Sequence, residues 1–337
     1  MNLRDRKIES LIKLGKWFSE LDLNKSHTEN QLKSENNNGW FTKWNINSAS
    51  QNWSRSLREK EIMMWVDNYK ITENPKIVSL ILAGNIPYVG LHDLLCVWFV
   101  GHKAKVKLSN KDPYLLPQVI SFLENECPET RGLITFTNEK IQDFDAAIAT
   151  GSNNSARYFD YYFSDVPNII RKNKTGVAVL DGSESSTDLK ALGYDIMCHY
   201  GLGCRNVSKI FVPKNYDLNH IFRGLYEYSE VINLSKYANN YDYNKAVFLM
   251  SEYKFLDNGF FILKYDSKFK SPLSTAFIAE YDSLVDLNEL LLKNYDQIQC
   301  VVSNSKKTGK VRFGNSQKPK LTDYADDINT LDFLINL

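Results

Sequence analysis

The chain has 337 residues, and its 41 Lys and Arg nearly balance 40 Asp and Glu, which leaves a formal net charge of +1. So balanced a composition lacks the strong field typical of proteins that bind nucleic acid or anionic membranes, and we expect no nucleic-acid partner. No segment approaches the ~20 apolar residues of a membrane span. The N-terminus also lacks the apolar core of a signal peptide. We therefore expect a cytoplasmic protein with no integral membrane segment, long enough for two domains.

The cysteines and histidines are too few and too scattered for a disulfide framework or a metal site. Five cysteines are an odd number, they are widely spaced, and no Cys-x-x-Cys pair occurs. The five histidines show none of the spacings of zinc or haem motifs. We therefore predict no metal ion.

The first 65 residues predict helices separated by one loop. Apolar side chains recur at helical spacing over residues 1–24, and the polar residues 25–38 predict a loop. Tryptophans at 40, 44, 53 and 65 predict a helical region anchored in a core, while an aromatic platform for a ligand is the alternative.

From residue 76 onward, short apolar runs alternate with helical patterns. This alternation predicts a parallel sheet with helices on both faces. A similar alternation begins again near residue 176, so two α/β units meet near residues 172–178. The expected strands are 76–82, 104–108, 133–136, 145–150, 177–180, 208–212, 260–264, 274–278 and 298–302, and the expected helices are 92–100, 113–125, 154–163, 186–200, 219–227 and 284–294.

These patterns predict three segments of chain. Residues 1–176 would hold the N-terminal helices and a cofactor-binding α/β domain, and residues 177–310 a catalytic α/β domain. Residues 311–337 would return to the first domain or make an oligomer contact.

Turns rich in small and amide residues follow three of the predicted strands. They are Gly84-Asn85, the stretch 107–110 and the stretch 151–154. Ligands of open parallel sheets bind beyond the carboxyl ends of the strands, so these turns suggest a nucleotide lying across the sheet edge. None of them matches Gly-x-Gly-x-x-Gly or a P-loop.

Cys204 stands in a tight turn, Gly201-Leu202-Gly203-Cys204-Arg205, just before a predicted strand. Its glycines would let a ligand approach the backbone, and Arg205 would favour a thiolate. A small buried hydrophobic residue is the other interpretation of a lone cysteine. The local chemistry leaves both open.

Several of these segments together resemble the aldehyde dehydrogenase superfamily. Gly-x-x-Cys-x-x-x-Ser over residues 201–208 is similar to its catalytic-cysteine signature, and Ala83 to Pro87 to its Asn-x-Pro turn. Residues 106–109 resemble its Lys-Pro-Ser cofactor strand, and residues 149–152 its Thr-Gly-Ser turn. More narrowly, "LAGNIPYVGLHDLL", "IATGSNNSARYFDYYF" and "GLGCRNVSKIFVP" resemble the LuxC-type bacterial fatty acyl-CoA reductases.

The resemblance implies a two-domain fold with Rossmann-like parallel sheets and a covalent mechanism. Cys204 would attack an acyl thioester and form an acyl-enzyme, and Asn85 and the Cys204 backbone N–H would stabilise the oxyanion. A reduced nicotinamide would then supply hydride and release a fatty aldehyde. The substrate would be an acyl-CoA or acyl-protein thioester, and a homodimer is expected.

The resemblance also implies which residues hold the cofactor. They are Lys107, Ser109, Asn110, Gly151 and Ser152. Asn110 stands where NAD-preferring relatives carry a glutamate, so a 2′-phosphate would meet no carboxylate and Lys105, Lys107 or Lys111 could pair with it. This favours NADPH over NADH.

One departure bears on the reaction. Acid-forming relatives carry a water-activating glutamate in Glu-Leu-Gly-Gly, and the corresponding stretch here reads Val179-Leu180-Asp181-Gly182, with an apolar residue in place of the glutamate. A missing base favours reduction of the acyl-enzyme over hydrolysis. His199 is an alternative base for the thiol, although a surface or core histidine is the simpler interpretation.

Two other functions remain open. One is an acyl-transferring or thioesterase-like component that uses Cys204 without reduction, and the other is a non-catalytic subunit of the same fold.

Overall fold

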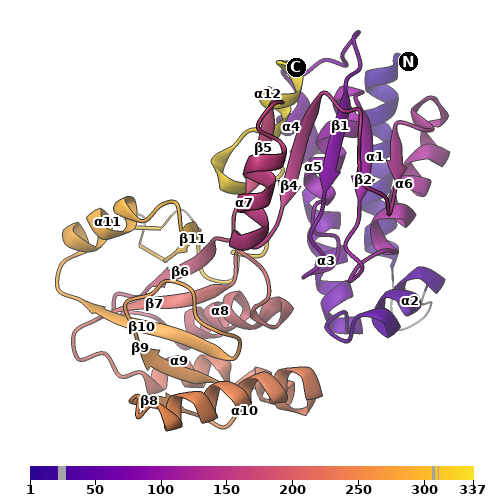
Figure 1. Cartoon of the computed structure of the whole chain (residues 1–337). Helices are drawn as coiled ribbons and strands as arrows, with labels where there is room; N and C mark the ends of the chain where they lie inside the picture. The colour runs from indigo at the N-terminus through magenta and orange to yellow at the C-terminus, as the bar shows by residue number, and fades with distance from the viewer. Residues whose placement is uncertain (22–27, 306–307, 310) are drawn as a thin grey trace. The chain divides into compact units, whose positions relative to one another are not determined.

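The chain folds around two separate β-sheets, one in each of two structural units (Figure 1). The computed structural model describes residues 1–21, 28–305, 308–309 and 311–337. The first unit is Met1–Asn173 with Pro319–Leu337, and the second is Lys174–Lys318. The division thus falls three residues before the boundary expected after residue 176, and only the last part of the 311–337 segment joins the first unit.

The sheet of the first unit is wholly parallel and has the order β3-β2-β1-β4-β5. From the central β1 the chain builds outward to β2 and β3 on one side and then to β4 and β5 on the other. The connections therefore diverge between β1 and β4, where an open α/β sheet leaves a crevice at its carboxyl edge. The strands are β1 (Ile77–Ile81), β2 (Lys103–Lys107), β3 (Ile134–Phe136), β4 (Ala146–Thr150) and β5 (Asn168–Arg171).

The apolar residues of this sheet are buried in two clusters beneath helices, and further helices form an N-terminal layer. Helix α5 is buried at nine of its ten positions, which is why its sequence is apolar all round. Trp53 and Trp65 pack into the same core, which confirms their role as anchors, whereas Trp44 is 40% exposed. The helices are α1 (Leu3–Glu20), α2 (Glu29–Asn37), α3 (Lys43–Ser56), α4 (Glu59–Val66), α5 (Leu91–Val100), α6 (Leu115–Glu126), η1 (Pro128–Thr130), α7 (Asn153–Tyr162), η4 (Ala325–Asp327) and α12 (Thr330–Ile335).

The second unit has a six-stranded sheet of order β11-β6-β7-β10-β9-β8. Its strands are parallel except for β8, which pairs antiparallel with β9 at the edge. The elements are β6 (Thr175–Val179), α8 (Ser186–Met197), η2 (Cys198–Gly201), β7 (Val207–Pro213), α9 (Asn219–Leu225), η3 (Tyr226–Asn233), α10 (Ser235–Met250), β8 (Phe255–Asp257), β9 (Ile262–Tyr265), β10 (Thr275–Tyr281), α11 (Leu284–Lys293) and β11 (Ile298–Val302).

Three sequence-based expectations differ from the structure. The loop predicted over 25–38 contains helix α2 in its described part, while residues 25–27 lie outside the described residues. The helix predicted over 186–200 ends at Met197, because His199 and Tyr200 take left-handed backbone conformations. Helices α10 and α12 and strands β5 and β8 were not predicted at all.

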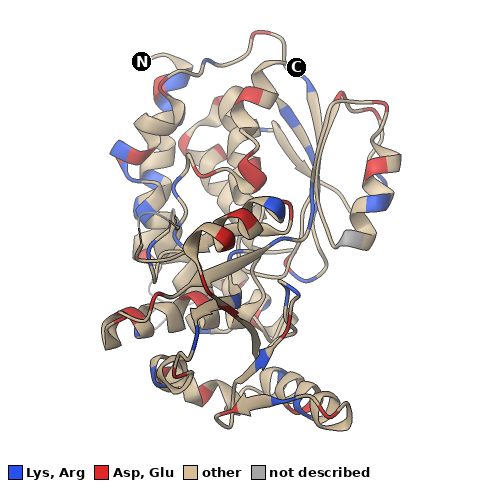
Figure 2. Cartoon of the chain, turned by 90° about the vertical axis from the view of Figure 1, so that its left-hand side faces the viewer, with Lys and Arg blue, Asp and Glu red and all other residues tan. Residues whose placement is uncertain are grey.

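Charged residues of both signs alternate along the helices of both units, in keeping with the near-zero net charge (Figure 2). Within the described ranges, no helix is both long and apolar enough to cross a membrane.

Candidate active site

The carboxyl edge of the first sheet gathers all six candidate residues of that unit. In the sheet register Ile81, the last residue of β1, pairs with Lys107 on one side and with Ala149 on the other. The turns after these three strands therefore lie side by side at the diverging point of the sheet. The six residues are Asn85 after β1, Lys107, Ser109 and Asn110 at and after β2, and Gly151 and Ser152 after β4.

Gly84 lets the turn that carries Asn85 pack against the turn after β2. A Cβ at this glycine would lie 2.7 Å from both Cβ and Oγ of Ser109, which is closer than real side chains approach. The absence of a side chain at position 84 thus fixes the spacing between the two turns.

The turn after β2 is closed by its own backbone and held from outside by helix α2. The Asp112 N–H donates to the Ser109 carbonyl at 3.0 Å, and the Lys111 N–H donates to the Ser109 hydroxyl at 3.2 Å. The side-chain amides of Asn37 and Asn38 donate to the carbonyls of Asn110 and Lys111, at 2.9 and 3.3 Å. This leaves the Asn110 side chain exposed on an ordered turn.

Asp112 is a buried carboxyl of this turn that the sequence did not single out. Burial raises its pKa to about 6, and its Oδ1 accepts the Leu115 N–H at the start of α6 at 3.3 Å. An acidic residue three positions before a helix is a capping signal that could have identified it.

Ser152 caps the helix that begins after β4. Its hydroxyl accepts the Ser155 N–H at 3.2 Å, and the two serine hydroxyls lie 3.0 Å apart. A Cβ at Gly151 would lie 2.8 Å from the Ser155 Cβ, so glycine is needed for the chain to enter α7 so tightly. The amide groups of the first turn of a helix favour an anion such as a pyrophosphate.

This donor set fits a dinucleotide. A half-buried lysine, hydroxyls, amides and a helix N-terminus stand together where open α/β sheets bind such ligands. Lys105, expected as one of three cations for a 2′-phosphate, is engaged elsewhere. Its Nζ donates to the carbonyls of Gln142 and Asp143, which precede β4 and so lie toward the opposite edge of the sheet.

In the second unit Cys204 occupies a sharp loop at the amino end of β7. His199, Tyr200 and Gly201 all have left-handed backbone, with φ of 53°, 56° and 81°, and turn the chain away from the end of α8. The Asn206 N–H then closes a tight turn on the Gly203 carbonyl at 3.1 Å, with Cys204 inside it. Cys204 is exposed, whereas the other four cysteines are buried thiols.

Asn206 is the anchor of this loop, and sequence reasoning missed it. Its side-chain N–H groups donate to the carbonyls of Asp195, Ile196 and Cys198, at 3.1, 3.1 and 2.6 Å. Its Oδ1 accepts the Gly203 N–H at 2.8 Å. One buried amide thus joins the end of α8 to the turn that holds the cysteine.

A second tie links the loop to residues 314–318. The Arg205 Nε donates to the Ser316 carbonyl at 2.5 Å, and the Asp195 carboxylate accepts the N–H groups of Gly314 and Ser316 at 2.6 and 2.8 Å. Burial raises the pKa of Asp195 to about 6. The guanidinium expected to act on the thiol is therefore also a structural link.

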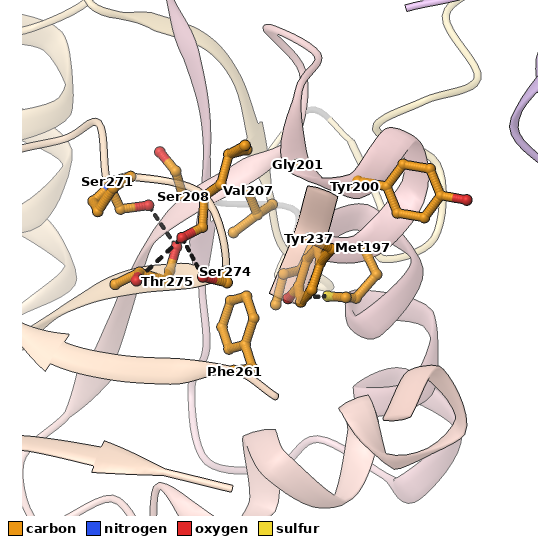
Figure 3. A pocket seen from close by; sticks show the side chains of 13 residues that line it. Met197, Tyr200, Gly201, Val207, Ser208, Tyr237, Phe261, Ser271, Ser274 and Thr275 are labelled. Atoms are coloured by element: carbon orange, nitrogen blue, oxygen red, sulfur yellow. Dashed lines mark hydrogen bonds between the residues drawn. The ribbon is translucent and has the colours of Figure 1, made fainter. Parts of the chain in front are cut away.

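A small pocket opens beside the loop (Figure 3). Its cavity volume is ≈ 20 Å³, about enough for one water molecule. Ser208, Ser271, Ser274 and Thr275 line one side of it, and Met197, Tyr200 and Tyr237 lie on the other. The cysteine loop and the segment before β10 thus both line this pocket.

The stretch compared with Glu-Leu-Gly-Gly lies at the opposite edge of the sheet from Cys204. Val179 pairs with Phe211 near the carboxyl end of β7, whereas Cys204 precedes the amino end, where Gly176 pairs with Val207. A side chain at Val179 or Asp181 would thus stand at the wrong edge of the sheet. The segments around the loop, residues 174–176, 201–208, 269–275 and 314–318, contain no Asp or Glu.

His199 is a buried histidine rather than a base poised for the thiol. Burial lowers its pKa to about 4, so it is neutral at neutral pH and accepts a proton poorly. Among the residues that the structure describes, no cluster of three or more His, Cys, Asp or Glu is placed to hold a metal ion.

No protein-family model matches the chain, and no curated protein matches it. Solved structures of aldehyde dehydrogenases do. Aldehyde dehydrogenase 21 of Physcomitrella patens, in complex with succinate, aligns over 100% of this chain and 84% of its own, with a TM-score of 0.67 and 12% identity. The P. syringae indole-3-acetaldehyde dehydrogenase with NAD+ covers 92% and 74% (TM-score 0.65, 11% identity). An NAD+ complex of a Bacillus cereus aldehyde dehydrogenase covers 91% and 73% (TM-score 0.61, 13% identity). The predicted fold class is confirmed: the chain has the aldehyde dehydrogenase fold.

Proposed function

We propose that the protein is an oxidoreductase that reduces a fatty acyl thioester, such as an acyl-CoA, to the aldehyde through an acyl-enzyme on Cys204, with NADPH as reductant. The observation that carries the proposal is the exposed Cys204 on a tightly anchored loop within an aldehyde dehydrogenase fold. A thiol meant only for packing would be buried, as the other four cysteines are.

In this reaction the Cys204 thiolate attacks the thioester carbonyl, the oxyanion collapses, and the CoA thiolate leaves with a proton from solvent. Asn85 and the Cys204 backbone N–H are proposed to donate to the oxyanion.

Lys107, Ser109, Asn110, Gly151 and Ser152 would hold the cofactor, which supplies the hydride that converts the acyl group to the aldehyde. The preference for NADPH is supported by the exposed amide of Asn110 on its anchored turn, since no carboxylate at that position would repel a 2′-phosphate. The solved neighbours named above that hold a cofactor hold NAD+, so the preference is a property proposed for this chain.

The choice of reduction over hydrolysis is supported by what surrounds Cys204 in its own unit. The flanking segments carry no carboxylate, and the buried Asp195 beside them already accepts two backbone N–H groups. With no carboxylate in these segments to activate water, the acyl-enzyme would persist until hydride arrives.

The test is a panel of acyl-CoAs of increasing chain length with NADPH or NADH, measuring free CoA, aldehyde and fatty acid. We expect CoA and aldehyde in equal amounts, faster with NADPH, and an acyl adduct on Cys204 by mass spectrometry when the cofactor is left out. Cys204→Ala should lose both, while the buried Cys127→Ala serves as the matched control.

The alternatives give different products. Release of CoA and fatty acid without any need for NADPH would indicate the thioesterase-like function. Absence of CoA release and of any adduct, from a folded protein, would indicate a non-catalytic subunit.

A further inference from the structure

The segment that precedes β10 runs alongside the cysteine loop, with a hydrogen bond near one end and a close approach near the other. The Ser208 hydroxyl donates to the Phe269 carbonyl at 2.9 Å. At the other end a Cβ on Gly201 would lie 3.6 Å from Leu273 Cδ2, which is van der Waals contact. Residue 208 thus meets 269 and residue 201 meets 273, so the two segments run in opposite directions. Lys270 lies between these anchors on one segment, as Cys204 does on the other.

The same arrangement is seen around the shared pocket. Gly201 comes from the loop, and Val207 and Ser208 from the start of β7 that follows it. Ser271 and Ser274 come from the facing segment, and Thr275 is the first residue of β10 (Figure 3). The Thr175 and Ser208 hydroxyls lie 2.6 Å apart, which fixes Ser208 to the neighbouring strand β6. The segment that carries Lys270 is therefore held, through Ser208, beside the amino ends of β6 and β7.

Lys270 and Cys204 are also coupled electrostatically. Partial burial lowers the pKa of the Lys270 ammonium, and the charge of Cys204 acts on it in the opposite direction. Such coupling is reciprocal, so an ammonium that is favoured by a thiolate favours that thiolate in return.

Several other ionisable groups lie around the loop, and their described contacts and burial are as follows. Arg205 donates to the Ser316 carbonyl, and Asp195 accepts two backbone N–H groups. Burial raises the pKa of Cys300 to about 12 and lowers that of His199 to about 4, so both are neutral at neutral pH. Lys318, on the segment 314–318, donates to the Gly314 carbonyl at 2.7 Å.

We propose that the Lys270 ammonium stabilises the Cys204 thiolate and so prepares the nucleophile before substrate arrives. The proposal rests on the proposed function for its purpose, since a thioester is attacked by the thiolate and not by the thiol. As a property of the resting protein, however, it can be measured without substrate or cofactor.

The test follows alkylation of Cys204 by iodoacetamide as a function of pH, with the modified residue located by peptide mass. Four proteins are compared: the wild type, Lys270→Met, Lys270→Arg, and Lys268→Met as a matched control on the same exposed segment. In Lys270→Met we expect the midpoint of the alkylation profile to rise by about one pH unit, which slows the reaction at neutral pH about tenfold. Lys270→Arg and Lys268→Met should keep the wild-type midpoint.

An unchanged midpoint in Lys270→Met would overturn the proposal. If this variant is unfolded by circular dichroism, salt gives the second measurement on the wild type. Raising the ionic strength should move its midpoint upward because the exposed pair is screened, and a midpoint that ignores salt would also count against the proposal.

The outcome is separable from that of the proposed function. A shifted midpoint in a protein that makes no aldehyde would keep the Lys270–Cys204 pair and reject the reductase. Aldehyde production with an unshifted midpoint would do the reverse.

Discussion

Asn206 gives the cysteine loop its shape with a single side chain. The last carbonyls of a helix have no partners within the helix, and those at the end of α8 find theirs in the Asn206 amide. The Oδ1 of the same side chain accepts the Gly203 N–H, so its oxygen and its N–H groups are all hydrogen-bonded within the protein. A residue two positions after Cys204 therefore holds the backbone turn that carries it.

Asn206→Ala should lower the free energy of unfolding by about 2 kcal/mol, because buried carbonyls lose their donor. The measurement is urea denaturation followed by circular dichroism. Asn239→Ala, at an exposed position of α10, is the matched control and should change stability little. Equal stability of Asn206→Ala and the control would show that the loop is held by other contacts.

Asp195 makes the stability of the second unit depend on pH. Its pKa is about 6 in the folded protein and near 3.8 when unfolded, so the native state binds the extra proton between these values. Its stabilising contribution is present below pH ~3.8 and is lost as the pH rises through ~6. In Asp195→Asn we expect the fall in unfolding free energy between about pH 4.5 and about pH 7.5 to be smaller by about 2 kcal/mol than in the wild type. Parallel pH profiles for the two proteins would contradict the assignment.

At the scale of elements, helix α2 connects the N-terminal layer to the proposed cofactor edge. Its last residue Asn37 and its cap Asn38 both donate to carbonyls of the turn after β2. Asn38 is buried while Asn37 is exposed, so the hydrogen bond from Asn38 is the better shielded from water. The end of α2 thus holds a turn of the proposed cofactor site that lies more than 70 positions further along the chain.

Asn38→Ala should therefore weaken NADPH binding several-fold while leaving the alkylation of Cys204 unchanged. The loss of one buried hydrogen bond of about 1 kcal/mol sets this scale. NADPH fluorescence titration measures the affinity, with Asn36→Ala, at an exposed position of the same helix, as control. An affinity equal to that of the control would separate α2 from the cofactor site.

The sequence pattern was insufficient for helix α2 because its buried face is polar. Helix α2 buries Gln31 and Ser34, which hydrophobic periodicity cannot register. Helix α10 buries Tyr237, Tyr241 and Phe248 together with Asn244, and the helical spacing of these aromatic residues could have revealed it. A capping box of Thr28 and Gln31 does mark the start of α2 and could have revealed it.

The candidate site was predictable as a set of turns but not as a geometry. Strand ends placed Asn85, Lys107 and Ser152 correctly at one sheet edge, because parallel strands end together. Val179 was assigned to the wrong edge, since strand register depends on pairing between β6 and β7 that no local pattern encodes. Lys270 is 66 positions from Cys204, and only the folded segment before β10 brings it near.

At the scale of the whole molecule, the chain leaves its first unit after residue 173 and comes back to it at residue 319. A buried ion pair of the first unit forms hydrogen bonds to the returning segment. The Arg171 guanidinium donates to both Asp93 carboxylate oxygens at 2.5 and 3.0 Å, and further to the Thr330 hydroxyl and the Ala325 carbonyl. Residues from β5, α5 and the C-terminal segment therefore meet in one polar cluster inside the first unit.

Removing one partner of this cluster should destabilise the first unit strongly. Arg171→Met leaves the Asp93 carboxylate buried without its counter-ion, and we expect a loss of about 3–5 kcal/mol. The double variant Arg171→Met with Asp93→Leu should recover part of this loss, since no buried charge remains. All six tryptophans lie between residues 17 and 98, so tryptophan fluorescence reports on the first unit alone. In urea, the fluorescence transition of Arg171→Met should move to lower denaturant than that of the wild type, and that of the double variant should lie between them. Coincident fluorescence transitions for all three proteins would mean that the C-terminal segment is held by its apolar residues Leu331 and Leu334, which are fully buried against the same core.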